Sequence, residues 1–200
     1  MVQAYKKTII LGITGASGSI YAMRLLDELA LQDIKVHIIV SKTGQDVVRY
    51  ETNQSTEEVV KIITERKNTK ANFIFEKYND YFSSVASGSY KTAGMVILPC
   101  SVSTIGSIAN GISTNLLHRA AAVCMKEKRK LILVPRETPL TSIDLQNLLT
   151  LSNNNATIMP ASPGFYHIPK SYDDIINFMV GKILDMLEIN HKLYKKWGDI

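Results

Sequence analysis

Short apolar runs alternate along this chain with longer stretches in which apolar residues recur every three or four positions. The runs are rich in β-branched residues and apolar on both faces, which is typical of strands in a parallel sheet covered on both sides. They predict strands at residues 8–13, 36–40, 73–75, 95–99, 131–135 and 157–159. The longer stretches predict helices at residues 20–31, 56–66, 103–109, 115–128, 143–151 and 171–187.

This alternation predicts a doubly wound α/β fold, with a mostly parallel sheet between two layers of helices. No internal repeat, low-complexity segment or linker divides the sequence, so we expect residues 1–200 to form one domain. Residues 77–92 are rich in Ser, Tyr and Gly and have the weakest pattern, and we interpret them as a long functional loop.

Composition and charge exclude several classes of function. The formal net charge is +5, which suits phosphorylated small molecules, whereas the basic stretch KEKRK (126–130) lacks the interleaved aromatic residues of nucleic-acid binders. No apolar run approaches the roughly 20 residues that span a bilayer, and no secretory leader precedes the first strand. We therefore expect a cytoplasmic protein that binds neither nucleic acid nor membranes. The two cysteines lie in apolar stretches and indicate no disulfide scaffold.

The segment IILGITGASGSIYAMRLL (9–26) predicts a strand, a glycine-rich turn and a helix start. Backbone N–H groups and the positive end of the helix would then face an anion above the sheet. The spacing of Gly12, Gly15 and Gly18 is not the G-x-G-x-x-G of dinucleotide folds, and no acidic residue ends the second strand, so a nicotinamide cofactor is disfavoured. The G-x-S-x-G nucleophile elbow is absent as well. A tight turn without a ligand remains the alternative.

Polar residues follow three more of the predicted strands. Ser41 follows the second, the stretch PCSVSTIG (99–106) follows the fourth, and Arg136 with Glu137 follows the fifth. Each alone is explained by a helix cap or an ion pair, but the carboxyl ends of parallel strands share one edge of the sheet. Together they favour a ligand bound at that edge.

Four stretches, TGASGSIYAMRLL, SGSYKTAGMVILPCS, NLLHRAAAVCMKEKRKLILVPRETPL and MPASPGFYHIPKSYDDIINFMVGKIL, resemble the flavin prenyltransferase family of the UbiX type. The resemblance covers nearly the whole chain and implies a Rossmann-like or flavodoxin-like subunit of a homo-dodecamer. It implies further that the protein joins a dimethylallyl group from dimethylallyl phosphate to N5 and C6 of reduced FMN, without a metal. The prenylated FMN would pass to a partner decarboxylase.

The resemblance also assigns roles to individual residues. The flavin-binding positions are Gly15, Ala16, Ser17, Ser41, Ser101, Val102, Ser103, Thr104 and Arg136. The positions around the prenyl phosphate are Ser87, Gly88, Arg119, Lys126, Arg136, Tyr166 and Lys182, of which Arg119 is an interface residue. The catalytic positions are Ser17, Glu51, Lys126 and Glu137. Many members have arginine at position 182, so the lysine here replaces a two-pronged donor with a point charge.

These residue types suit the chemistry. Breaking an allylic carbon–oxygen bond leaves a cation and an anionic phosphate, so lysine, arginine and tyrosine hydroxyl donors are expected around the phosphate, and π-faces around the cation. Phosphate hydrogen-bonded to Glu137 would take the proton from C6, and Glu51 with Ser17 would handle the proton at N5.

Three points stay open. A flavin-dependent cysteine decarboxylase is one alternative, although PASPGFYH (160–167) replaces the P-x-M-N-x-x-M-W substrate clamp of those enzymes, and a non-catalytic flavin carrier is another. The length of the prenyl donor, and whether it is a monophosphate or a diphosphate, are not readable. The tail, residues 188–200, is expected to pack on a neighbouring subunit or over the pocket.

Overall fold

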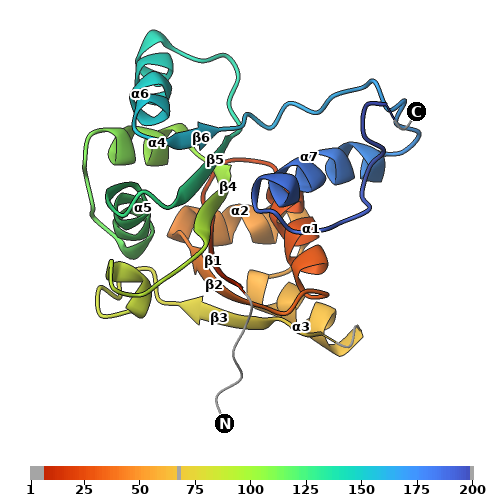
Figure 1. Ribbon diagram of the computed structural model, residues 1–200, viewed down its shortest axis with the longest axis horizontal. Coiled ribbons are helices and arrows are strands. Elements are labelled where there is room, and N and C mark those ends of the chain that lie inside the picture. The colour runs from red at the N-terminus through yellow and green to blue at the C-terminus, as the bar shows by residue number, and fades with distance from the viewer. Residues whose placement is uncertain (1–6, 67–68, 199–200) are drawn as a thin grey trace.

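A computed structural model describes residues 7–66 and 69–198 of the chain (Figure 1). Its six strands form one sheet in the order β3-β2-β1-β4-β5-β6, and every neighbouring pair is parallel. The strands are β1 (Lys7–Ile13), β2 (Ile34–Val40), β3 (Asn72–Glu76), β4 (Gly94–Cys100), β5 (Lys130–Pro135) and β6 (Ala156–Ile158). The predicted doubly wound α/β fold is confirmed, and all six predicted strands are present with ends shifted by one or two residues.

Helices cover both faces of this sheet. They are α1 (Ser19–Leu29), α2 (Lys42–Thr52), α3 (Thr56–Arg66), α4 (Val102–Ala109), α5 (Leu116–Lys126), α6 (Ser142–Asn153) and α7 (Tyr172–Met186), with a short 3-10 helix η1 (Ser84–Ala86). One core cluster joins α1, α2, α3 and α7 to the sheet, and a second joins α4, α5, α6 and η1 to its other face (Figure 1). Apolar side chains on both faces of the central strands fill the two clusters, which explains their continuous apolar runs.

Helix α2 has no counterpart in the sequence prediction. Its sequence, KTGQDVVRYET, is mostly polar, and only Gly44 and Val48 are buried. Only two of its eleven residues are buried, so it lacks the recurring apolar positions from which the other helices are predicted. The local signal that starts it is Ser41, whose hydroxyl accepts a hydrogen bond from the Gly44 N–H at 3.0 Å.

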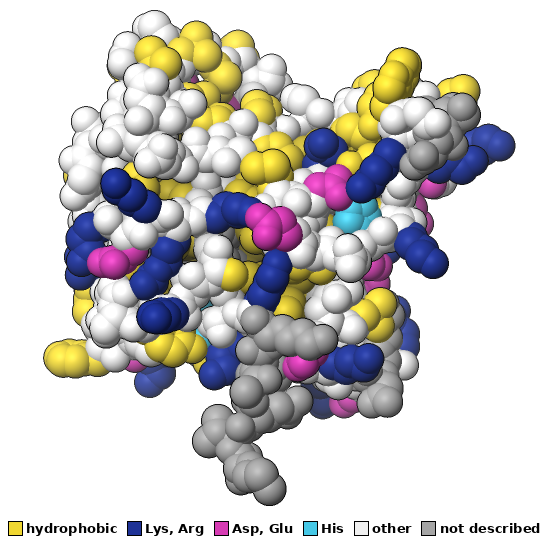
Figure 2. Space-filling model, in the orientation of Figure 1, with side chains coloured by type: hydrophobic (Ala, Val, Ile, Leu, Met, Phe, Trp, Pro, Cys, Tyr) yellow, Lys and Arg dark blue, Asp and Glu magenta, His cyan; other side chains and the backbone are white. Residues whose placement is uncertain are grey.

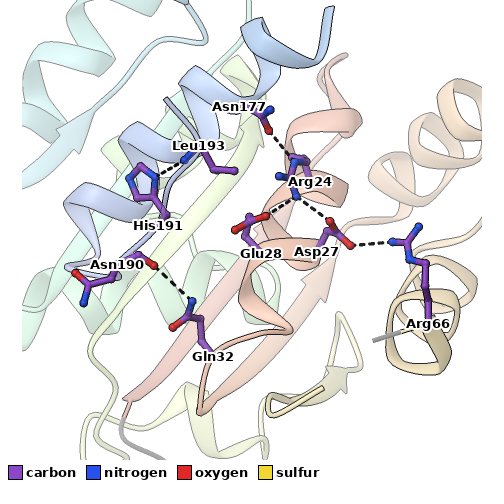
Figure 3. Close-up of polar contacts among 9 residues, drawn as sticks. All are labelled: Arg24, Asp27, Glu28, Gln32, Arg66, Asn177, Asn190, His191 and Leu193. Atoms are coloured by element: carbon purple, nitrogen blue, oxygen red, sulfur yellow. Dashed lines mark hydrogen bonds and ion pairs between the residues drawn. The ribbon is translucent and has the colours of Figure 1, made fainter. Parts of the chain in front are cut away.

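Helix α1 connects the other helices on its face of the sheet (Figure 3). The Arg24 guanidinium donates to Asn177 of α7 at 2.8 Å and pairs with Asp27 and Glu28 at 2.7 Å each. Arg66 at the end of α3 pairs with Asp27 at 2.9 Å. These contacts hold α3 and α7 to a helix that begins directly at the glycine-rich turn.

None of the helices within residues 7–66 and 69–198 combines the length and the apolar character that a bilayer crossing requires.

The start of β4 depends on a glycine. Gly94 has φ +155°, and a Cβ there would lie 2.6 Å from the Lys130 carbonyl oxygen of β5.

We expect Gly94→Ala to lower the free energy of unfolding by about 2–3 kcal/mol, because alanine would strain the backbone at this φ and its Cβ would collide with β5. Urea unfolding followed by circular dichroism measures it. The matched control is Gly106→Ala on α4, where the nearest atom would lie at 3.4 Å, so a change of less than about 1 kcal/mol is expected. Equal losses in both variants would contradict this explanation.

Candidate functional site

The site lies where the winding of the sheet reverses. Helix α1 leaves β1 toward one face of the sheet, and α4 leaves the adjacent β4 toward the other, so the carboxyl ends of these two strands stay uncovered. Ligands of open α/β sheets bind in the crevice that such a reversal creates.

Thr14 joins the two strand ends and was missed by the sequence analysis. Its buried hydroxyl donates to the Pro99 carbonyl at 2.8 Å and accepts from the Ser101 N–H at 2.8 Å. The loop after β1 is therefore fixed to the loop after β4. The available signal was a hydroxyl residue that immediately follows an apolar strand.

A cleft of about 300 Å³ opens above these loops. Its walls are Gly15, Ser41, Lys42, Thr43, Tyr78, Ser101, Ser103, Thr104, Ser107, Thr114, Asn115 and His118. The structure thus brings together five predicted flavin-binding positions, and four of the other seven lining residues also have hydroxyl groups. Such a lining offers hydrogen-bond donors to an oxygen-rich anion such as a phosphate.

Three helix N-termini meet at this cleft. Ser41, Ser101 and Asn115 are the N-caps of α2, α4 and α5, and each cap side chain lines the cleft. Helix starts expose unpaired N–H groups and carry partial positive charge, and Lys42 adds a full charge beside them. The arrangement is an anion-binding site by its chemistry.

His118 adds a hydrogen-bonding group to the cleft without adding charge. Burial lowers its pKa below the ordinary value of 6.5, so the imidazole is neutral at pH 7. Its Nδ1 lies 3.1 Å from the Asn115 amide nitrogen, which holds the ring against the start of α5. The sequence analysis did not assign Asn115 or His118 to the site, because nothing in the apolar pattern of α5 marks its first turn as exposed to a ligand.

The glycine-rich turn itself differs from expectation. The anion at the start of α1 belongs to the chain: the Glu51 carboxylate, from the end of α2, accepts from the Gly18 N–H at 3.1 Å and the Ser19 N–H at 2.8 Å. Because Glu51 lies on the helix that the pattern did not predict, periodicity gave no sign of this contact, and only the family resemblance had placed Glu51 near Ser17. The expectation of an external anion on these N–H groups is corrected accordingly.

Ser17, Glu51 and Arg136, which we call the α1 cluster, lie together at this helix start. Burial raises the pKa of Glu51, but hydrogen bonds from the Ser17 side chain and from the Ser19 and Gly18 N–H groups outweigh it, so the pKa lies below its ordinary value. The Arg136 Nε donates to the Ser17 carbonyl at 3.2 Å. Glu137 is exposed beside Arg136 and accepts from the Thr138 N–H at 3.1 Å.

Four predicted phosphate-side residues gather elsewhere, around η1 and α5; we call Ser87, Gly88, Arg119 and Lys126 the η1 cluster. The Arg119 Nε donates to the Ala86 carbonyl at 3.0 Å, and Lys126 pairs with Glu127 at 3.2 Å. A Cβ on Gly88 would collide with the carboxylate of the same Glu127.

Lys126, Ser87 and Gly88 lie toward the opposite end of the sheet from the α1 cluster, whereas Arg119 lies in the first turn of α5, next to the cleft residue His118. Lys126 comes shortly before β5 and Arg136 directly after it, and this six-residue strand is about 20 Å long at about 3.3 Å per residue. Ser87 and Gly88 likewise precede β4, whereas the cleft lies beyond its end. One chain therefore does not bring all the predicted site residues together.

Tyr166 and Lys182 lie in a third place, at α7. Tyr166 precedes the helix and contacts Phe178 and Trp197 edge-on, with ring centroids 5.7 Å and 5.2 Å apart. Lys182 is exposed on the helix. The described part of the tail folds back on α7 of the same chain, where His191 pairs with Asp185 at 3.1 Å. Packing of the tail on a neighbouring subunit or over the pocket stays a prediction.

Comparisons with known proteins agree with this architecture. A family model described as Flavoprotein matches residues 2–184. The flavin prenyltransferase UbiX of Alkalihalophilus pseudofirmus is 47% identical over 200 residues, which is the full length of both chains. A crystal structure of AnUbiX with FMN and dimethylallyl pyrophosphate is 32% identical, with a TM-score of 0.88 over 96% of this chain and 97% of that one. A dodecameric FMN-dependent UbiX-like decarboxylase from Escherichia coli O157:H7 is 35% identical, with a TM-score of 0.87 over 95% and 98%.

The low pKa of Glu51 makes a pH-dependent contribution to stability. A carboxyl group whose pKa is depressed by folding stabilises the fold above its unfolded pKa, and that stabilisation is lost as the pH falls through the folded pKa, here below 4.5. We expect Glu51→Gln to destabilise the protein relative to wild type at pH 7, with a smaller difference near about pH 3. Urea unfolding at both pH values tests this. Asp46→Asn, the same change on the exposed face of α2, is the control. A difference that does not depend on pH would contradict the assignment.

Proposed function

The chain belongs to the flavin prenyltransferase (UbiX) family of flavoproteins, and from this premise we propose that it joins a dimethylallyl group to N5 and C6 of reduced FMN. Dimethylallyl phosphate is the proposed donor, and the prenylated FMN is the product that a partner decarboxylase uses. The observation that carries the proposal is the convergence of three capped helix starts on one hydroxyl-lined cleft at the β1–β4 reversal.

The cleft suits the phosphate end of FMN. Ser41, Ser101, Ser103 and Thr104 would donate hydroxyls, and the starts of α2 and α4 would supply N–H groups and positive charge. The backbone at Gly15 approaches Thr43 so closely that a Cβ on residue 15 would lie 2.5 Å from the Thr43 side chain. Glycine therefore allows the loop after β1 to pack against the start of α2 at the edge of the cleft. Reduced FMN supplies the nucleophilic N5 and C6 atoms.

The α1 cluster would serve the proton chemistry. The lowered pKa keeps Glu51 ionised at pH 7, where it accepts from Ser17 and orients this hydroxyl. Ser17 would then exchange a proton with N5 of the bound flavin. Arg136 would neutralise charge on the phosphate that leaves the prenyl group. Glu137 would form a hydrogen bond with this phosphate, and the phosphate would accept the proton from C6. Tyr166, Lys126 and Lys182 would complete the donors around the phosphate.

Assembly would join the clusters that one chain keeps apart. We propose a homo-oligomer, a dodecamer like the Escherichia coli structure, in which the η1 cluster of one subunit faces the α1 cluster of another. Exposed apolar side chains support subunit contacts: Ile143, Leu145 and Leu149 of α6 are all exposed, and Figure 2 shows apolar side chains at the surface in its upper left part, where α6 lies. An apolar patch of this kind is typical of an interface. The proposed place of action is the cytoplasm, without nucleic acid or membrane as partner.

The other two functions are less well supported. The curated relatives at 43–47% identity are named flavin prenyltransferases, and PASPGFYH occupies the place of the cysteine decarboxylase clamp. A carrier would need the flavin cleft alone, yet the chain also has the α1 cluster with its charged groups.

Anaerobic incubation of the protein with reduced FMN and dimethylallyl phosphate tests the proposed transfer. We expect mass spectrometry of the released flavin to show an increase of one five-carbon unit, because the cluster donors stabilise the leaving phosphate. Glu137→Gln should reduce the rate by about 10²-fold or more. Reactions without donor are the control, and parallel reactions with dimethylallyl diphosphate decide which donor is used. Flavin that binds and returns unchanged with both donors would exclude the transferase and favour the carrier.

Mixed oligomers test whether the clusters come from different subunits. Lys126→Ala and Arg136→Ala each remove one cluster, so we expect each homo-oligomer to be nearly inactive. Co-expressed as mixed oligomers, they should recover about a quarter of wild-type activity, because random assembly pairs two intact clusters at about that frequency. The control is the homo-oligomer of the double variant Lys126→Ala/Arg136→Ala, in which every subunit lacks both residues. Mixed oligomers as inactive as the single variants would show that both residues act from the same subunit.

A further inference from the structure

A buried histidine in the middle of the sheet has no role in the site described above. His37 lies in β2, a strand of otherwise apolar residues apart from one lysine, and only 3% of it is exposed. Burying an imidazole without hydrogen bonds is costly, so its partners indicate what it holds.

Both ring nitrogens of His37 have partners. Nδ1 lies 2.6 Å from the Glu76 carboxylate at the end of β3, and Nε2 lies 2.9 Å from the Tyr90 hydroxyl. With the ring proton on Nδ1, the imidazole donates to Glu76 and accepts from Tyr90, so both ring nitrogens and the Tyr90 hydroxyl are hydrogen-bonded. The Tyr90 ring packs edge-on against the imidazole at 5.4 Å, which fixes the direction of the hydroxyl.

Tyr90 ends the turn that contains Ser87 and Gly88. Its N–H donates to the Ser87 carbonyl at 3.3 Å, which closes the turn. On the outer side, Arg129 donates one guanidinium N–H to the Tyr90 carbonyl at 2.7 Å and another to the Gly88 carbonyl. The turn is thus held from inside the sheet by His37 and from outside by Arg129.

We propose that His37, Tyr90 and Glu76 are positioning residues that set the Ser87–Gly88 turn for the phosphate of the prenyl donor. This inference rests on the proposed function. His37 and Glu76 touch no ligand themselves. Their hydrogen bonds pass from two sheet strands to the Tyr90 hydroxyl, and the Tyr90 N–H holds the Ser87 carbonyl three residues earlier, so the turn between them is closed. A turn held in this way presents its hydroxyl and N–H groups without paying to order them when the phosphate binds.

Tyr90→Phe tests the proposal, because it removes one hydroxyl and keeps the ring. We expect amide hydrogen exchange of residues 83–92 to accelerate by about tenfold while exchange of β2 stays unchanged. We also expect the KM for dimethylallyl phosphate to rise by about fivefold or more, with kcat and the Kd for FMN within about twofold of wild type. Tyr50→Phe, which removes an exposed hydroxyl from α2, is the control for both measurements.

A second pair of variants checks the inner partner. Glu76→Leu removes the acceptor of His37 Nδ1, whereas Glu76→Gln keeps an acceptor oxygen and loses only the charge. We expect Glu76→Leu to reproduce the effects of Tyr90→Phe and Glu76→Gln to recover most of the wild-type exchange protection and KM.

Each remaining outcome has a definite meaning. Unchanged exchange of residues 83–92 in Tyr90→Phe overturns the inference, and so does faster exchange with an unchanged KM. A parallel loss of FMN affinity and melting temperature would show general destabilisation and would also overturn it. Wild-type protein that makes no prenylated flavin would refute both the proposed function and the role of the turn in binding the donor phosphate. The hydrogen-exchange measurement needs no turnover, so it would still decide whether the Tyr90 hydroxyl stabilises the Ser87–Gly88 turn.

Discussion

Unpaired N–H groups at helix starts are the constraint on which this structure depends. Four helices, α1, α2, α4 and α5, begin at the cleft or at the glycine-rich turn beside it, and each start needs a negative or hydrogen-bonding partner. Three of them, α2, α4 and α5, satisfy one N–H with their own cap residue and direct the rest of their positive charge into the same cleft. The reversal of winding between β1 and β4 makes this convergence possible, and the buried hydroxyl of Thr14 keeps the two strand ends in register.

The start of the fourth helix, α1, is satisfied by a different part of the chain, and this gives it a different role within the site. Helix α1 receives the Glu51 carboxylate, so its N–H groups are taken by the chain itself. In the proposed enzyme, the three open starts hold the phosphate of FMN, and the closed start becomes the place of proton chemistry. The hydrogen bonds that satisfy the first N–H groups of α1 also lower the pKa of Glu51 and keep it charged. They therefore both stabilise the helix start and prepare the carboxylate for its proposed role.

Helix α5 connects the cleft to the far side of the subunit. Its first turn contributes Asn115 and His118 to the cleft, and its last residue is Lys126, about 16 Å further along at 1.5 Å per residue. In the proposed oligomer, one rigid element therefore serves two sites, with the flavin of its own subunit at its start and the prenyl phosphate of a neighbour at its end. The clamp of His37 and Arg129 on the Ser87–Gly88 turn fits this view, because a donor surface offered to another subunit must be held in place before the two meet.

The sequence by itself determined the strands, the glycine-rich turn, the family motifs and, within the described residues, six of the seven long helices. These depend on local periodicity, caps and residue type, which are properties of short segments. The resemblance placed Glu51 near Ser17, but only the tertiary structure showed that Glu51 accepts from the first N–H groups of α1. The structure alone also decided that Thr14 joins two strand ends and that Asn115 and His118 enter the cleft. It also decided that Lys126 and Arg136, both flanking β5 in sequence, lie toward opposite ends of the sheet. Such contacts are made across long separations in the chain, where the pattern of one segment carries no information about its partner.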